Sequence, residues 1–154
     1  MAAKKGDNSR AVLIDGINRT LADHFALYMK TKSFHWHLKG PRFRDLHLLF
    51  DEQAAQIFGV TDAMAERARK LDVATLTSVG SIAKHARIKD DDRTDIDADD
   101  MIKALHDDNA RLVEDLKALK DAAEEAGDNA TSALADEWQD AAEERVWFLR
   151  QSLR

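Results

Sequence analysis

The chain has 154 residues, of which 44% are hydrophobic and 34% are charged, and its formal net charge at pH 7 is −6. This length is typical of one domain with its own core, and the acidic balance argues against a nucleic-acid surface spread over the whole molecule. The absence of cysteine excludes disulfides, thiolate metal sites and a cysteine nucleophile, so any metal site must use nitrogen and oxygen ligands.

Six glycines and a single proline leave the chain rich in helix formers and poor in turn residues, which favours an all-α fold. No stretch approaches the roughly 20 apolar residues of a membrane span, and the N-terminus lacks the apolar run of a signal peptide. We therefore expect one all-α domain over residues 1–154, with a short flexible tail at residues 1–8, in the cytoplasm and without a membrane partner.

Two long helices are predicted in the first half of the chain. Apolar residues recur at helical spacing from Leu13 to Tyr28 and predict a helix over about residues 9–38, which Gly40 and Pro41 end. A second apolar repeat predicts a helix over about residues 42–70. The proline stands near the first turn of this helix, where its missing N–H does no harm.

Residues 72–96 are predicted to form a long connection, with a short helix over residues 81–88, because the apolar repeat lapses there into small, polar and charged residues. A third helix is predicted to begin after the acidic run of residues 95–100 and to stop at Gly127, and a fourth to run from Asp128 or Asn129 to the C-terminus. Four long helices with one long crossover match the connectivity of ferritin-like bundles, although cytokine and purely structural bundles follow the same packing rules.

Four candidate metal ligands lie on the second predicted helix, namely His47, Asp51, Asp62 and Glu66. At about 100° per residue these side chains fall within roughly 100° of one face, but about 16 Å of helix separates the first pair from the second. One helix therefore cannot bring all four onto a single metal ion. If a second copy packs antiparallel about a two-fold axis near residues 56–57, the first pair of one chain meets the second pair of the other. His35, at the end of the first helix, then lies where it can complete the set.

A simpler interpretation is that these are ordinary surface pairs, in which Glu66 forms an ion pair with Lys70 one turn later. The pairs taken together are harder to explain in this way, because Asp62 and Glu66 repel each other on one helix face. We therefore expect a positive charge beside them.

The five residues form the pattern H-x(11)-H-x(3)-D-x(10)-D-x(3)-E, from His35 to Glu66, which resembles the pattern of the Dps family, the DNA-binding proteins from starved cells or miniferritins. The HW, LKGPRF and DAMAERA segments around it, and the WF pair at residues 147–148, also look like the family. The resemblance implies a ferritin-like four-helix bundle whose long crossover carries a short helix, and a hollow shell of twelve subunits.

The resemblance also implies an enzyme, a ferroxidase that oxidises iron(II), preferentially with hydrogen peroxide, at di-iron sites on two-fold interfaces and stores the ferric mineral inside the shell. By the family's pattern His35, Asp62 and Glu66 hold the tighter of two iron ions, while His47 and Asp51 hold the second ion or its water. Imidazole and carboxylate ligands suit iron(II) and iron(III), and zinc competes for the same groups.

Further candidate residues follow from the resemblance. Trp36, beside His35, is a candidate to take up stray oxidising equivalents, but a tryptophan on a helix is as often a core or interface residue. The family has acidic pores at three-fold axes near the turn between the last two helices. Asp128 matches one acidic pore position, whereas Ala133 stands where another is expected, so Asp136 and Glu137 are candidates to replace it.

The alternative function is that of a DNA-compacting or structural helical assembly protein with vestigial metal sites. A classical ferritin is disfavoured, because its bundle-core site requires Glu-x-x-His pairs and the sequence contains none. DNA binding is expected to be weak or absent, since the tail offers only Lys4, Lys5 and Arg10, and a shell of twelve such chains would carry a formal charge of about −72. Any association with the nucleoid would depend on that tail.

Overall fold

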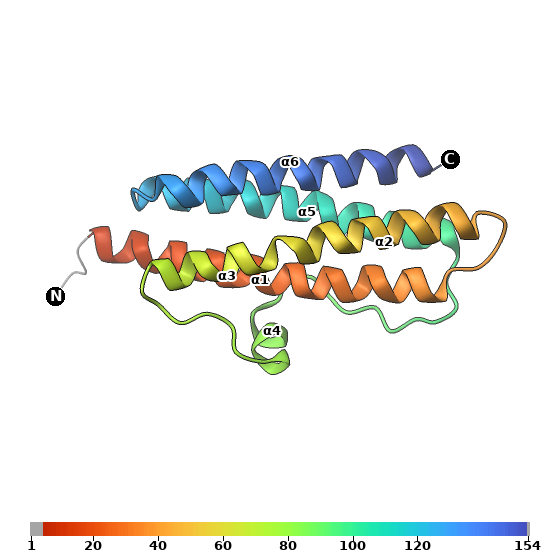
Figure 1. Ribbon diagram of the computed structural model, residues 1–154, viewed down its shortest axis with the longest axis horizontal. Helices are drawn as coiled ribbons and strands as arrows, with labels where there is room; N and C mark the ends of the chain where they lie inside the picture. Colours follow the sequence, from red (N-terminus) through yellow and green to blue (C-terminus); the bar gives the residue numbers. More distant parts are fainter. Residues whose placement is uncertain (1–4, 154) are drawn as a thin grey trace.

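The computed structural model describes residues 5–153, and every regular element within this range is a helix. Four rods form a bundle, namely α1 (Lys5–His37), α2 with α3 (Phe43–Gly59 and Thr61–Lys70), α5 (Ala98–Glu125) and α6 (Asn129–Ser152). Figure 1 shows α5 and α6 side by side in one layer and α1 with α2 and α3 in the other, while the short helix α4 (Val79–His85) stands off the bundle on the crossover. The predicted ferritin-like connectivity is confirmed. None of the described helices is both long and apolar enough to cross a membrane.

The core lies between the two layers and contains side chains from all four rods. Ile17, Phe50, Leu112 and Leu149 are examples that are completely buried. These positions belong to the apolar repeats that the sequence shows at helical spacing, so the apolar stripe of each helix faces the middle of the bundle. Burial of the stripes fixes the rotation of each helix about its axis, and with it the direction of the polar side chains.

The first helix begins at Lys5, one turn before the predicted start near Ser9. Residues 5–8 of the expected tail are therefore helical, and residues 1–4 lie outside the described residues. The additional turn is consistent with the cooperativity of helix formation, since adding a residue to an existing helix costs far less than starting one.

The second predicted helix is divided at Val60, whose φ and ψ of −97° and −5° interrupt the regular helix between α2 and α3. Gly59 has a low helix propensity, and the hydroxyl of Thr61 donates to the carbonyl of Phe58 at 2.7 Å, which favours a break here. The rod continues across the break (Figure 1), because the N–H of Met64 still donates to the carbonyl of Val60. The prediction of one uninterrupted helix was wrong at this point, but both pairs of candidate ligands remain on one rod.

The short helix α4 lies earlier in the chain than the predicted residues 81–88. A capping box led by Ser78 starts the helix two residues sooner than predicted. The helix also ends sooner, because the N–H groups of Arg87 and Ile88 donate to the carboxylate of Asp23 on α1 instead of to helix carbonyls. Contacts distant in sequence therefore decide where this helix ends.

The turn between α5 and α6 has the predicted glycine at its centre. Gly127 adopts a φ of +74°, in the left-handed region that glycine enters without a steric penalty. Its N–H donates to the carbonyl of Glu124 at 3.1 Å, and that of Asp128 donates to the carbonyl of Ala123 at 2.8 Å, which is the Schellman arrangement. The carboxylate of Asp128 then starts α6 by accepting from the N–H of Thr131 at 3.1 Å.

Candidate metal centre

The end of α1 and the first turns of α2 bring His35 and His47 together. Gly40 reverses the chain between the helices with a φ of +107°, which a residue with a side chain rarely adopts. The two imidazole rings stack with their centroids 3.7 Å apart and an interplanar angle of 13°. Phe43, in the first turn of α2, also stacks on His47 at a centroid distance of 4.8 Å. Both imidazoles are thus held by ring contacts in one orientation.

Each of these histidines is also held by the backbone of the other. Nδ1 of His35 donates to the carbonyl of His47 at 2.6 Å, and Nδ1 of His47 donates to the carbonyl of His35 at 2.8 Å. A carbonyl can only accept a hydrogen bond, so Nδ1 carries the proton in both rings and Nε2 keeps the lone pair when the ring is neutral. A backbone carbonyl on the second ring nitrogen is one of the usual ways in which proteins orient a metal-binding histidine.

Asp51 lies one turn beyond His47, with its Oδ1 3.9 Å from Nε2 of His35. Its carboxylate accepts a hydrogen bond from Lys32 at 2.8 Å, and this bond, with the positive charge of the lysine, holds the pKa of Asp51 below its ordinary value. The carboxylate is therefore ionised at neutral pH. Imidazole nitrogen and carboxylate oxygen are ligand types that suit iron(II) and zinc, but in this structure the carboxylate of Asp51 is hydrogen-bonded to Lys32.

Trp36 lies at the edge of this group. The residue is 57% exposed, which shows that it is not a core residue of this chain. Nζ of Lys32 is 5.9 Å from the centroid of the ring, within the usual range of a cation–π contact. Trp36 is therefore connected to Asp51 through the same lysine.

Asp62 and Glu66 lie on α3, beyond the break at Val60, and both side chains are exposed. Within residues 5–153, Glu66 makes no ion pair with Lys70, so the simpler interpretation of the sequence receives no support there. Both carboxylates point outward from the part of the bundle that the structure describes.

The five candidate ligands thus fall into two groups within one chain. His35, His47 and Asp51 are neighbours, whereas Asp62 and Glu66 lie further along the α2–α3 rod. In the described part of the chain, no three histidine, aspartate or glutamate side chains converge closely enough to hold a metal ion. A complete site with all five ligands would require a second chain.

The candidate pore residues have different environments. Asp128 is largely buried and accepts hydrogen bonds from Arg67 at 3.0 Å and from the N–H and hydroxyl of Thr131. Burial opposes its ionisation, but these bonds keep the pKa of Asp128 below its ordinary value. Asp136 accepts from Lys120 at 2.9 Å, and Glu137 is exposed. The oxygens of Asp128 are therefore engaged in capping α6, and its role in a pore stays a prediction.

The sequence prediction missed a charged residue in the bundle core. Arg145 on α6 is 2% exposed, and its Nε donates to Oδ1 of Asn109 on α5 at 2.8 Å. Burial lowers the pKa of Arg145 to about 10, which leaves it protonated at neutral pH. A metal ion in the bundle core would be repelled by this guanidinium. The signal was present in the sequence, because Arg145 stands in the apolar stripe between Ala142 and Leu149.

Comparison with known proteins points to one family. A model of the ferritin-like domain matches residues 14–154. The chain is 32% identical over 137 residues to a DNA protection during starvation protein of Brevibacillus brevis, with 89% of this chain and 91% of the relative covered. It superposes on the X-ray structure of Dps from Thermosynechococcus elongatus with a TM-score of 0.94 at 26% identity, over 98% of this chain and 96% of that one.

A Dps protein from Vibrio cholerae O1, described as a member of a broad superfamily of ferritin-like diiron-carboxylate proteins, gives a TM-score of 0.89 at 30% identity, over 97% of this chain and 92% of that one. The family model covers most of the chain, and the relatives match over nearly their whole length. The chain therefore belongs to the Dps family of ferritin-like proteins.

Proposed function

We propose that this protein is a ferroxidase and iron store that oxidises iron(II) at sites shared between two chains. The observation that carries the proposal is the pair of stacked histidines, whose Nδ1 protons are both donated to backbone carbonyls and whose Nε2 atoms are left for a metal. Iron is the substrate here, and zinc is expected to compete for the same ligands.

The second chain supplies Asp62 and Glu66. If two α2–α3 rods pack antiparallel, the histidine end of one rod lies against the acidic end of the other, and a two-fold axis gives two such sites. An apolar face beside the axis supports this packing, since Phe58 is 51% exposed and contacts Tyr28 and Phe25 at ring distances of 5.2 and 6.4 Å. The family implies that six such pairs close into a shell of twelve chains with the mineral inside.

Hydrogen peroxide is the oxidant that we expect. Each iron(II) gives up one electron, and peroxide needs two electrons and two protons to become two water molecules. Two iron ions at one site supply both electrons together, so that no hydroxyl radical is released. The carboxylates of Asp51, Asp62 and Glu66 favour the iron(III) product, because hard anionic oxygen ligands bind it more strongly than imidazole does. The proposed role is therefore detoxification as well as storage.

The test is complementation between two inactive chains. One carries His35→Ala with His47→Ala, and the other carries Asp62→Ala with Glu66→Ala. Each variant alone should lose fast oxidation of anaerobically added iron(II) by peroxide, followed by ferric absorbance. A mixed pair has one intact site of two, so an equal, randomly paired mixture should recover about a quarter of the wild-type sites.

The matched control replaces two exposed acids one turn apart on α6, Asp140→Ala with Glu144→Ala, and should leave the oxidation rate unchanged. Recovery of no activity in mixtures that light scattering shows to be assembled would contradict shared sites. Unchanged activity in the variant lacking Asp62 and Glu66 would place the chemistry elsewhere. A wild-type monomer at neutral pH and moderate salt would contradict the two-chain site altogether.

A further inference from the structure

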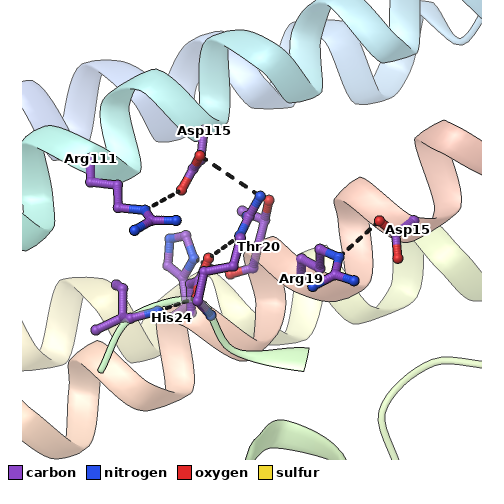
Figure 2. A network of polar contacts seen from close by, with 9 residues as sticks. Asp15, Arg19, Thr20, His24, Arg111 and Asp115 are labelled. Carbon is purple, nitrogen blue, oxygen red and sulfur yellow. Dashed lines mark hydrogen bonds and ion pairs between the residues drawn. The ribbon is translucent and has the colours of Figure 1, made fainter. Parts of the chain in front are cut away.

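The two histidines of the candidate metal centre are held differently from the other histidines on the helices. In His24, His37 and His85, Nδ1 bonds the backbone carbonyl one turn earlier in the same helix. Figure 2 shows the first of these, His24, close to Thr20 on α1. Such a bond needs no second helix. His35 and His47 instead bond carbonyls on each other's helix and stack, so the positions of their rings depend on contacts between α1 and α2.

The imidazole of His47 has a ring against each of its two faces. The ring of His35 is stacked on it at a centroid distance of 3.7 Å, which leaves no space for another ring on that side. Phe43 is stacked on the same imidazole at 4.8 Å with an interplanar angle of 25°, so it lies against the opposite face. The order of the stack is therefore Phe43, His47 and His35.

The two faces matter because a hydrogen bond alone does not fix the plane of an imidazole. The bond from Nδ1 of His47 to the carbonyl of His35 sets the direction of that N–H. The ring can still tilt about this direction, and a tilt moves Nε2. The lone pair of Nε2 lies in the ring plane, so a tilted ring does not direct it at a fixed metal position. Contacts on both faces restrain the tilt.

Phe43 is well placed to supply the outer contact. It stands one turn before His47 on α2, and side chains at this spacing are neighbours on a helix. Its N–H donates to the carbonyl of Gly40 at 3.0 Å, so the turn that brings the two histidines together also fixes the backbone of Phe43. The residue is 42% exposed, and packing of the bundle core therefore does not account for its ring.

We propose that Phe43 is a positioning residue for metal binding, whose ring fixes the plane of the His47 imidazole and directs Nε2 at the metal. The inference rests on the proposed function, because that function makes His47 a ligand of the second of two metal ions. An aliphatic side chain in place of Phe43 should leave the Nδ1 bond intact but allow the ring to tilt. Loss of a group that orients a metal-binding histidine typically weakens metal affinity by about 10–100-fold.

The experiment compares Phe43→Leu and Phe43→Tyr in the assembled full chain, with zinc as a redox-inert probe. Phe43→Leu should raise the dissociation constant of the weaker zinc position, measured by calorimetry, by about tenfold. X-ray absorption at the zinc edge should show fewer imidazole ligands per zinc than in the wild type, a change that a merely structural role of Phe43 would not produce. Phe43→Tyr keeps the aromatic ring and should retain wild-type values in both measurements.

The matched control is Phe148→Leu on α6. Phe148 is 40% exposed, close to the value for Phe43, but its ring contacts Trp147 at a centroid distance of 5.1 Å instead of an imidazole. This variant therefore removes an equally exposed phenyl ring away from the histidines. It should change neither the zinc affinity nor the number of imidazole ligands.

Wild-type zinc affinity and wild-type imidazole ligation in Phe43→Leu would overturn the inference and leave the proposed function untouched. An equal loss in Phe43→Tyr or in Phe148→Leu would also overturn it, because the ring on His47 would then not be the cause. If Phe43→Leu does not assemble by light scattering, Phe43→Met supplies a second aliphatic side chain for the same comparison. A failure of the proposed function is recognised separately, because the wild-type protein would then bind zinc without imidazole ligands or not at all.

Discussion

Lowering the pH from about 6.5 to about 4 should destabilise the bundle through one buried side chain, that of His24. The imidazole is almost completely buried on α1, where its Nδ1 donates to the carbonyl of Thr20 at 2.7 Å. Burial, assisted by the positive charge of Arg145, lowers the pKa of His24 from 6.5 to about 4. The bond to Thr20 and the nearby charge of Asp23 act in the opposite direction but do not compensate.

The magnitude follows from the two pKa values. Between pH 6.5 and 4 the unfolded chain binds a proton at His24, whereas the folded chain does not. The stabilising contribution is therefore complete above pH 6.5 and is lost progressively as the pH falls toward 4. One pKa unit corresponds to 1.36 kcal/mol, so the total loss is about 3 kcal/mol. This is a large part of the stability of an ordinary domain.

The assay is urea unfolding between pH 7.5 and 4.5 for the wild type and for His24→Asn. Asparagine keeps an N–H that can donate to Thr20 but does not titrate, so the difference between the two pH profiles isolates His24. This difference is needed because burial raises the pKa of Asp108 and Asp115, which adds stability in both proteins as the pH falls. Parallel profiles for wild type and variant would refute the reasoning.

Three further predictions concern other parts of the molecule. Lys32→Met removes the cation that is hydrogen-bonded to Asp51, so the dissociation constant of zinc, measured by calorimetry as a redox-inert probe, should fall at least several-fold. An unchanged dissociation constant would exclude Asp51 as a ligand. Asn109→Ala removes the hydrogen-bond partner of the buried Nε of Arg145 and should lower the free energy of unfolding by about 2–3 kcal/mol. Adding Arg145→Met to this variant should recover part of the loss. If the two substitutions instead change the free energy of unfolding additively, the coupling between Asn109 and Arg145 is contradicted. Gel shifts near 0.15 M salt should show weak or no DNA binding, and any low-salt complex should disappear when residues 1–10 are deleted, whereas tight, salt-resistant complexes would support a DNA-compacting role.

The helical framework could be predicted because periodic apolar residues and turn residues act locally. The third and fourth helices meet at Gly127 as predicted, since the Schellman turn depends on a few consecutive residues. The break at Val60 and the early end of α4 were missed. The first arises from weak local preferences that do not appear in the apolar pattern, and the second arises from Asp23, which lies more than sixty residues before the bonds that it accepts.

The candidate site was predictable in its residue types and spacing but not in its internal bonds. That His35 and His47 would be neighbours followed from the short turn between the first two helices. Nothing in the spacing indicated that each imidazole would donate a hydrogen bond to the backbone carbonyl of the other histidine, or that Lys32 would donate one to the carboxylate of Asp51. Arg145 interrupts an apolar stripe, but only the three-dimensional structure shows that Asn109 is its partner.

The reciprocal bonds between the two histidines have a consequence for how this protein can change over time. His35 lies in the last turn of α1, where backbone carbonyls lack partners within the helix, and the ring of His47 supplies one. Each imidazole therefore ties down the turn between two helices whether or not a metal is bound. Asp62 and Glu66 are exposed on α3, and within the described residues neither makes a hydrogen bond or ion pair that would stabilise the fold. In a descendant released from selection for iron chemistry, Asp62 and Glu66 should be substituted first, whereas His35 and His47 should be retained because they stabilise the turn between α1 and α2.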